Sequence, residues 1–255
     1  MKIPGRFIAA LLFCVLFITF SQSQTKEENI PLIKGDMAQI LVYTKTMGYR
    51  HKSIEKGVST LKNLGLTNNF SIVQTEDSLQ FNDANLKKYD LVLFLSTTLD
   101  VLGPDGEKAF KTYINNGGNY MGIHAASDTE YDWPWYGKLV GAYFTSHPNN
   151  PNVREAKMNV VDKKHPATAH LKDSWVRTDE WYNYKLVNTE MQVLIFLDES
   201  SYEGGTNGDN HPIAWYHEFD GGRVFYTGGG HTEESYDEPD FQKHLLGGIN
   251  YCLGR

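Results

Sequence analysis

The sequence predicts a doubly wound α/β fold, a mostly parallel sheet with helices on both faces. Apolar segments of strand length alternate with amphipathic segments of helix length over the first 140 residues, a pattern typical of parallel sheets. After residue 153 strand-like segments predominate, so we expect extra β-rich loops in the second half. No Pro/Ser-rich linker or internal repeat divides the chain, and we therefore expect one domain over residues 38–253.

The first β-loop-α unit is predicted between residues 38 and 63. Residues 38–44 form a short apolar run bounded by turn residues, which predicts a buried strand. Ser53 has the character of a helix N-cap, and the helix that it starts is expected to continue to residue 63 with Gly65 as its stop.

The remaining elements follow from the same two patterns. Short apolar runs predict strands at residues 70–74, 89–95, 119–124, 154–161, 193–197, 211–216 and 223–227. Amphipathic runs predict helices at residues 107–115, 135–140 and 241–251.

The first 23 residues have the composition of a secretory signal peptide. Lys2 and Arg6 precede an apolar run at residues 7–20, and small residues precede a cleavage site predicted after Ser23. The run is short for a membrane span, although an uncleaved anchor is an alternative. We expect a polar leader at residues 24–37 and a periplasmic or secreted protein, with no stable membrane insertion after cleavage.

Cysteine usage and charge narrow the class of protein further. Cys14 lies within the signal run, so Cys252 has no partner for an internal disulfide. The chain of 255 residues carries 31 acidic against 24 basic residues, a formal net charge of −7. A nucleic-acid partner is disfavoured because phosphate backbones require a basic surface. The oligomeric state stays open, a homo-oligomer included.

The candidate site lies where the predicted parallel strands end. Ligands of open α/β sheets bind beyond the carboxyl ends of the strands. This rule brings together the loops at residues 45–51, 96–100, 124–131 and 228–233.

His124 heads the loop at residues 122–128, whose sequence GIHAASD is similar to a nucleophile elbow. Small residues there would let the side chain stand at the head of a strained strand-to-helix turn. Histidine is a poor hydrolytic nucleophile, so this position favours acid/base chemistry, metal ligation or substrate orientation. A structural histidine satisfied by backbone groups is the alternative.

The sequence TGGGHTE at residues 227–233 forms the second candidate site loop. Its glycines permit close backbone approach, and we expect Glu233 to orient His231 for catalysis. A simple tight turn is the alternative, because the spacing is not that of a P-loop.

A metal site would have to be assembled from separated residues. The chain contains no HExxH or CxxC motif, and a divalent metal such as Zn²⁺ could be held by His124, His211 and His231. Other polar residues of the long loops are weaker candidates individually: His147, Arg177, Asp179 and Glu180.

Aromatic residues crowd the same loops. Flat rings interleaved with Asp, Asn and His suit the apolar faces and hydroxyl edges of a sugar, although core packing would explain most of them. We expect a small-molecule carbohydrate to be bound by a set of polar and aromatic side chains: Arg50, His51, Asp128, Tyr131, Trp133 and Trp181.

Several motifs in order resemble the trehalose-utilisation (ThuA-like) family over about residues 38–251. They are TKTMGYRH at 44–51, TED at 75–77, GIHAA at 122–126, DTEY at 128–131, HPIAW at 211–215, GGRVFYT at 221–227, GHT at 230–232 and HLLGGI at 244–249. The resemblance implies a class I glutamine-amidotransferase-like (flavodoxin-like) fold and a link to disaccharide or keto-sugar catabolism. It does not imply glutaminase chemistry, because His124 stands where amidotransferases carry a nucleophilic cysteine.

Three functional hypotheses from different classes remain. The first is an exported hydrolase, lyase or isomerase of carbohydrate catabolism, in which His124 and His231 act as acid/base or metal-binding groups. The second is a periplasmic protein that binds a sugar without catalysis. A partner-binding module that uses the fold as a scaffold is a third alternative.

Overall fold

A nine-stranded sheet dominates the computed structural model, which describes Met1 and residues 37–255. The strand order is β2-β1-β3-β4-β11-β10-β9-β6-β7. Beyond Met1, the predicted signal peptide lies outside the described residues, and so does the predicted leader apart from Met37. Within the described residues, no helix is long and apolar enough to cross a membrane.

Five neighbouring strands run parallel, which confirms the predicted α/β class. They are β1 (Ala38–Tyr43), β2 (Phe70–Thr75), β3 (Leu91–Leu95), β4 (Asn119–Ile123) and β11 (Gly222–Thr227). Every residue of β3 is buried, as expected for a central strand covered on both faces. The strand order reverses between β1 and β3, so the loops that follow these two strands flank the place where such sheets bind ligands.

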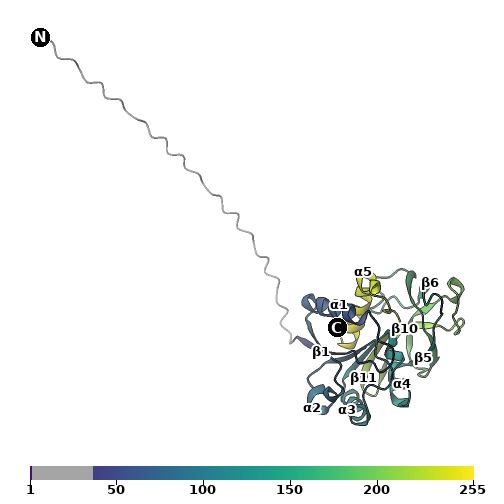
Figure 1. The fold of residues 1–255 in the computed structure, drawn as a ribbon, viewed down its shortest axis with the longest axis horizontal. Coiled ribbons are helices and arrows are strands. Elements are labelled where there is room, and N and C mark those ends of the chain that lie inside the picture. The colour runs from purple at the N-terminus through teal and green to yellow at the C-terminus, as the bar shows by residue number, and fades with distance from the viewer. Residues whose placement is uncertain (2–36) are drawn as a thin grey trace. The chain divides into compact units, whose positions relative to one another are not determined.

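Helices cover both faces of the parallel strands (Figure 1). One side carries α1 (Ile54–Thr67) and α5 (Pro239–Cys252), and the other carries α2 (Asp83–Leu86), α3 (Pro104–Asn115) and α4 (Pro134–Val140). The prediction that Gly65 ends the first helix is wrong, because α1 continues to Thr67. Gly65 is instead the point of closest approach to β2, where a Cβ atom would lie 2.5 Å from the carbonyl oxygen of Phe70.

The second half supplies the antiparallel part of the sheet. Its strands are β10 (Pro212–Phe219), β9 (Gln192–Leu197), β6 (Val153–Val160) and β7 (Ser174–Glu180). A separate two-stranded sheet joins β5 (Ala142–Ser146) to β8 (Asn183–Leu186). The expectation of β-rich additions is confirmed, but the sequence did not predict β5, β7 or β8. In β7, polar and charged residues interrupt the apolar alternation that would have revealed a strand.

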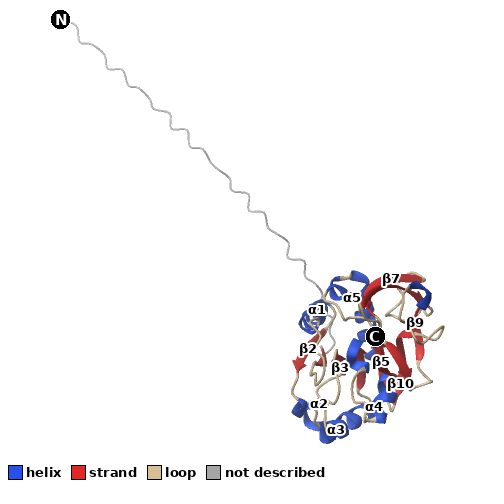
Figure 2. Cartoon of the chain, turned by 45° about the vertical axis from the view of Figure 1, so that its right-hand side comes forward, coloured by secondary structure: helices blue, strands red, loops and turns tan. Residues whose placement is uncertain are grey.

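The strand β7 forms one edge of the sheet and lies beside α5 (Figure 2). Arg177 of β7 donates hydrogen bonds to the carboxylate of Glu238, the N-cap residue of α5, with Nε 2.6 Å from Oε2. The same guanidinium lies 4.3 Å from the ring centroid of Phe241. These contacts dock the end of β7 against the loop that follows β11.

Candidate functional site

His124 follows β4 directly and stands on a strained turn. Its φ is 52°, in the left-handed region that non-glycine residues rarely adopt, and the chain then enters a 3₁₀ turn, η2 (His124–Ser127). The elbow-like geometry predicted from the small residues around it is therefore confirmed. The ring is buried, and its Nδ1 lies 2.9 Å from the carbonyl oxygen of Gly228. A carbonyl only accepts, so Nδ1 carries a proton and Nε2 faces the site, where it donates to Glu180 when the ring is charged and offers a lone pair when the ring is neutral.

His231 lies in the loop after β11, and Asp179 of β7 holds that loop in place. The backbone N–H groups of Gly230 and His231 donate to the two carboxylate oxygens of Asp179 over 2.8 and 3.0 Å. Gly230 has a φ of 112°, which explains why glycine occupies this position. The loop thereby directs His231 Nδ1 to 3.3 Å from Nε2 of His124.

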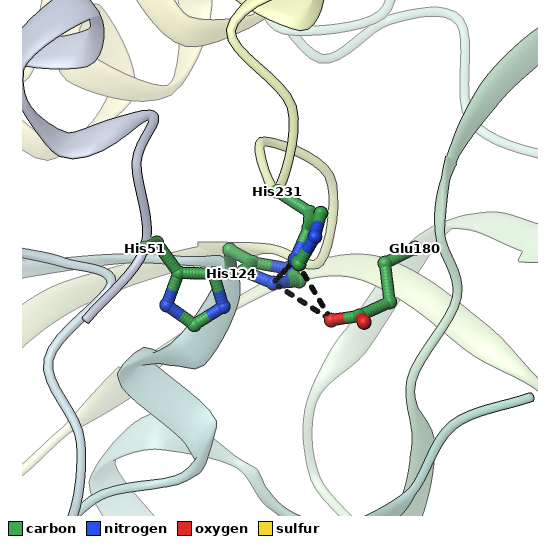
Figure 3. Close-up of side chains that lie close together, drawn as sticks. All are labelled: His51, His124, Glu180 and His231. Atoms are coloured by element: carbon green, nitrogen blue, oxygen red, sulfur yellow. Dashed lines mark hydrogen bonds and ion pairs between the residues drawn. The ribbon is translucent and has the colours of Figure 1, made fainter. Parts of the chain in front are cut away.

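His51 comes from the loop after β1 and completes a group of three imidazoles (Figure 3). Its ring stands edge-on to those of His124 and His231, with centroids 4.7 and 5.1 Å away. Burial and the two neighbouring imidazoles lower the pKa of His51 to about 2, so this ring is neutral at physiological pH.

Glu180, the last residue of β7, places its carboxylate against two of these rings (Figure 3). Its Oε2 lies 2.9 Å from Nδ1 of His231 and 3.4 Å from Nε2 of His124. The other oxygen, Oε1, accepts a hydrogen bond of 2.6 Å from the amide of Asn152. Burial alone would raise the pKa of Glu180, but the hydrogen bonds and charges of His124 and His231 hold it well below its usual value. The carboxylate is therefore ionised.

The cluster opens into a cavity of about 420 Å³. This volume is sufficient for a small organic molecule. Three aromatic residues, Tyr49, Phe144 and Tyr182, contribute to its wall. The other lining residues are His51, Asp128, His147, Asn149, Asn150, Pro151, Asn152, Glu180 and His231.

A larger cavity, of about 680 Å³, lies at the opposite ends of the strands, beside Ala38, Asp90 and Asn119. None of the described residues that line it is a histidine or a cysteine. We place the candidate site in the smaller cavity because it combines the imidazoles with a buried carboxylate.

The structure brings together four of the predicted site residues. His51, His231 and Asp128 line the cavity, and His124 lies buried beside it in contact with Glu180 and His231. Tyr131 is not among the described lining residues, but its hydroxyl donates a 2.6 Å hydrogen bond to Asp128, which is.

The predicted roles of Glu233 and His211 require correction. Glu233 is exposed at the N-cap of the turn Glu234–Asp237, and the carboxylate beside His231 belongs to Glu180. His211 does not belong to the cluster, and both its nitrogens are engaged elsewhere. Nδ1 lies 2.7 Å from Oε1 of Glu199, and Nε2 lies 2.8 Å from the carbonyl oxygen of Tyr182.

Arg50, Trp133 and Trp181 are absent from the described lining of the cavity. Arg50 pairs with Glu55 and Glu76 at 2.7 and 2.9 Å on the protein surface. Trp181 is fully buried and donates its indole N–H to the carbonyl of Arg154. Trp133 stacks on Trp135 at a centroid distance of 4.7 Å. The expectation that the two tryptophans face a sugar is therefore wrong, and core packing explains them.

In the sequence, Glu180 and His147 are recognisable only as polar residues of long loops, and no pattern distinguishes Asn152. The signal that could have identified Glu180 is its neighbour Asp179, since two successive acidic residues end a strand before an aromatic pair. Successive residues of a strand point to opposite faces, so Asp179 and Glu180 can serve different purposes. Here Asp179 holds the loop of His231, while Glu180 meets the ring itself.

The family model described as trehalose utilisation matches residues 39–252. A ThuA-like protein from Bacteroides uniformis ATCC 8492 has a similar structure, with a TM-score of 0.71 and 22% identity over 86% of this chain and 92% of that one. A ThuA-like protein from Parabacteroides merdae ATCC 43184 gives a TM-score of 0.70 and 19% identity over 86% and 90% of the two chains. No curated protein matches significantly. Because the family model spans nearly all the described residues, the chain belongs to the ThuA (trehalose utilisation) family.

Proposed function

We propose that the protein is an enzyme of carbohydrate catabolism that acts on a disaccharide or a keto-sugar in the cavity beside His124, His231 and Glu180. The observation that carries this proposal is the convergence of three imidazoles and one ionised carboxylate on a cavity of about 420 Å³. The family's description, trehalose utilisation, supports a carbohydrate substrate.

The arrangement is suited to proton transfer. Nε2 of His124 and Nδ1 of His231 lie 3.3 Å apart, and Glu180 stabilises whichever ring holds a positive charge. Hydrolysis, elimination and isomerisation of a sugar each need a proton given to or taken from carbon or oxygen. Asp128, whose pKa is raised by burial, is available at the cavity wall to bond a sugar hydroxyl.

The test is product detection on a panel of disaccharides, trehalose included, and their 3-keto forms. Chromatography coupled to mass spectrometry separates hydrolysis, elimination and isomerisation by the mass of each product. We expect conversion by the wild type and none by Glu180→Gln. If the wild type converts none of the sugars in the panel, the proposal that the protein is an enzyme is wrong.

The composition of the cavity wall favours a second candidate, a sugar-binding protein without catalysis. Tyr49, Phe144 and Tyr182 offer aromatic faces, and Asn149 and Asn152 offer amide groups beside them. In this case calorimetry would detect sugar binding without product. Tyr182→Ala would remove the binding, whereas His124→Ala would only weaken it.

A further inference from the structure

We infer that His124, His231 and Glu180, with His51 as a fourth partner, form a binding site for one divalent transition-metal ion. The ligand atoms that the four residues offer all lie within 4.8 Å of one another. A bound ion would occupy the same Nε2, Nδ1 and Oε2 atoms that the proposed function uses for proton transfer, so in the metal-loaded protein His124, His231 and Glu180 would serve as ligands and not as proton-transfer groups. Metal binding is expected whether or not turnover is found.

The spacing of three atoms matches the coordination sphere of such an ion. Nε2 of His124, Nδ1 of His231 and Oε2 of Glu180 are separated by 2.9, 3.3 and 3.4 Å. An ion about 2.1 Å from each ligand places octahedral neighbours roughly 3.0 Å apart and tetrahedral neighbours roughly 3.4 Å apart. The observed separations fall at or close to these values, so the ion fits with little movement.

The surrounding residues prepare the ligand atoms for an ion. The carbonyl of Gly228 accepts a hydrogen bond from Nδ1–H of His124, so in the neutral ring Nε2 is the nitrogen with a free lone pair. Asn152 occupies Oε1 of Glu180 and leaves Oε2 for the metal. Figure 3 shows His51 beside this group with one ring nitrogen turned toward His124.

The donor set selects the class of metal. Imidazole nitrogens with a single carboxylate suit Zn²⁺, Fe²⁺, Co²⁺ or Ni²⁺, whereas Mg²⁺ and Ca²⁺ prefer oxygen ligands throughout. His231 and Glu180 line the cavity, so an ion held between them has open positions on that side. Those positions would take oxygens of a bound molecule, such as the adjacent carbonyl and hydroxyl of a keto-sugar.

The experiment measures metal binding directly, without a sugar. The purified protein is stripped with a chelator, dialysed and titrated with Zn²⁺ by calorimetry, and elemental analysis gives the stoichiometry. We expect one Zn²⁺ per chain for the wild type and an affinity at least about 100-fold lower for Glu180→Gln and for His231→Ala. His170→Ala is the matched control, because His170 lies outside both the cavity lining and the four-residue group. It should bind Zn²⁺ like the wild type.

A second measurement covers the case in which a variant folds poorly. Co²⁺ added to the stripped wild-type protein should produce visible absorption bands characteristic of nitrogen and oxygen ligation. Zn²⁺ should also raise the melting temperature of the wild type but not that of Glu180→Gln. A wild-type protein that binds neither Zn²⁺ nor Co²⁺ would overturn the metal site, and so would variants that bind as tightly as the wild type. If Zn²⁺ binds and no sugar is converted, only the enzyme proposal is removed.

Discussion

The hydroxyl of Ser53 donates a hydrogen bond of 2.9 Å to the backbone carbonyl of Gly230, 177 residues away in the chain. Ser53 is the N-cap residue of α1, yet its side chain does not cap the helix. It joins the loop of His51 to the loop of His231 instead. One buried hydroxyl group therefore links the loop that carries His51 directly to the loop that carries His231.

Ser53→Ala is expected to loosen both loops. Loss of the hydrogen bond leaves the Gly230 carbonyl unpaired and lowers the free energy of unfolding by about 1 kcal/mol. Hydrogen exchange followed by mass spectrometry should show faster exchange in residues 51–53 and 228–231. Ser59→Ala, at an exposed position of the same helix, serves as the control and should change neither segment. Unchanged exchange in Ser53→Ala would contradict the role assigned to this bond.

His124→Ala and His231→Ala are each expected to lower turnover of the sugar identified in the panel by about 10²- to 10⁴-fold, the usual size of a lost proton-transfer group. Folding should be retained, as judged by circular dichroism. Glu233→Gln is the control, because Glu233 is exposed at the N-cap of η4 (Glu234–Asp237) and the structure gives it no bond to His231. Full activity in both histidine variants would show that the cluster is not the active site.

His211→Ala is expected to act on stability. The substitution leaves Glu199 and the Tyr182 carbonyl without their buried partner, which costs about 2–3 kcal/mol of the free energy of unfolding. Chemical denaturation measures this loss. His147→Ala, at a partly exposed histidine, should cost less than about 1 kcal/mol. Equal losses in the two variants would argue against a structural role specific to His211.

Glu130 is expected to make stability depend on pH. Burial, assisted by Asp100 and Glu107, raises its pKa to about 7 although two backbone N–H groups donate to Oε1. Because the folded pKa exceeds the unfolded value near 4.5, the contribution is full below pH 4.5 and is lost as the pH rises through about 7.

Glu130→Gln removes that titration. Its stability relative to the wild type should therefore increase between pH 5 and pH 8, by a total of about 3 kcal/mol. Urea denaturation at both pH values tests the change, with the exposed Glu155→Gln as control. A constant difference between Glu130→Gln and the wild type at the two pH values would refute this assignment.

We also propose that the apolar run at residues 7–20 directs export and that cleavage follows Ser23. In a bacterial host that secretes through the general pathway, the mature protein should begin at Gln24. Intact-mass spectrometry of the periplasmic fraction measures its N-terminus. Recovery of the full chain in the membrane fraction would favour the uncleaved anchor instead.

The sequence was sufficient for the parallel half of the fold and for the histidines. Apolar strands ending at Tyr43, Ile123 and Thr227 place the following loops at one edge, and His51, His124 and His231 lie in those loops or directly after a strand. Glu180 could not be placed in the same way. Its position depends on how β7 docks against α5, and that docking rests on side-chain contacts between Arg177, Glu238 and Phe241.

The carboxylate of the site is contributed by a peripheral strand, whereas the imidazoles belong to the parallel strands and their loops. The chemistry is thus divided between the parallel half of the sheet and its far antiparallel edge. Exchanging the β6–β7 pair, residues 153–180, would replace the acidic partner and also Asp179, so the new segment would have to supply both a carboxylate for the site and a support for the loop of His231. In a protein of this architecture, new reactions could therefore arise by replacing one edge of the sheet.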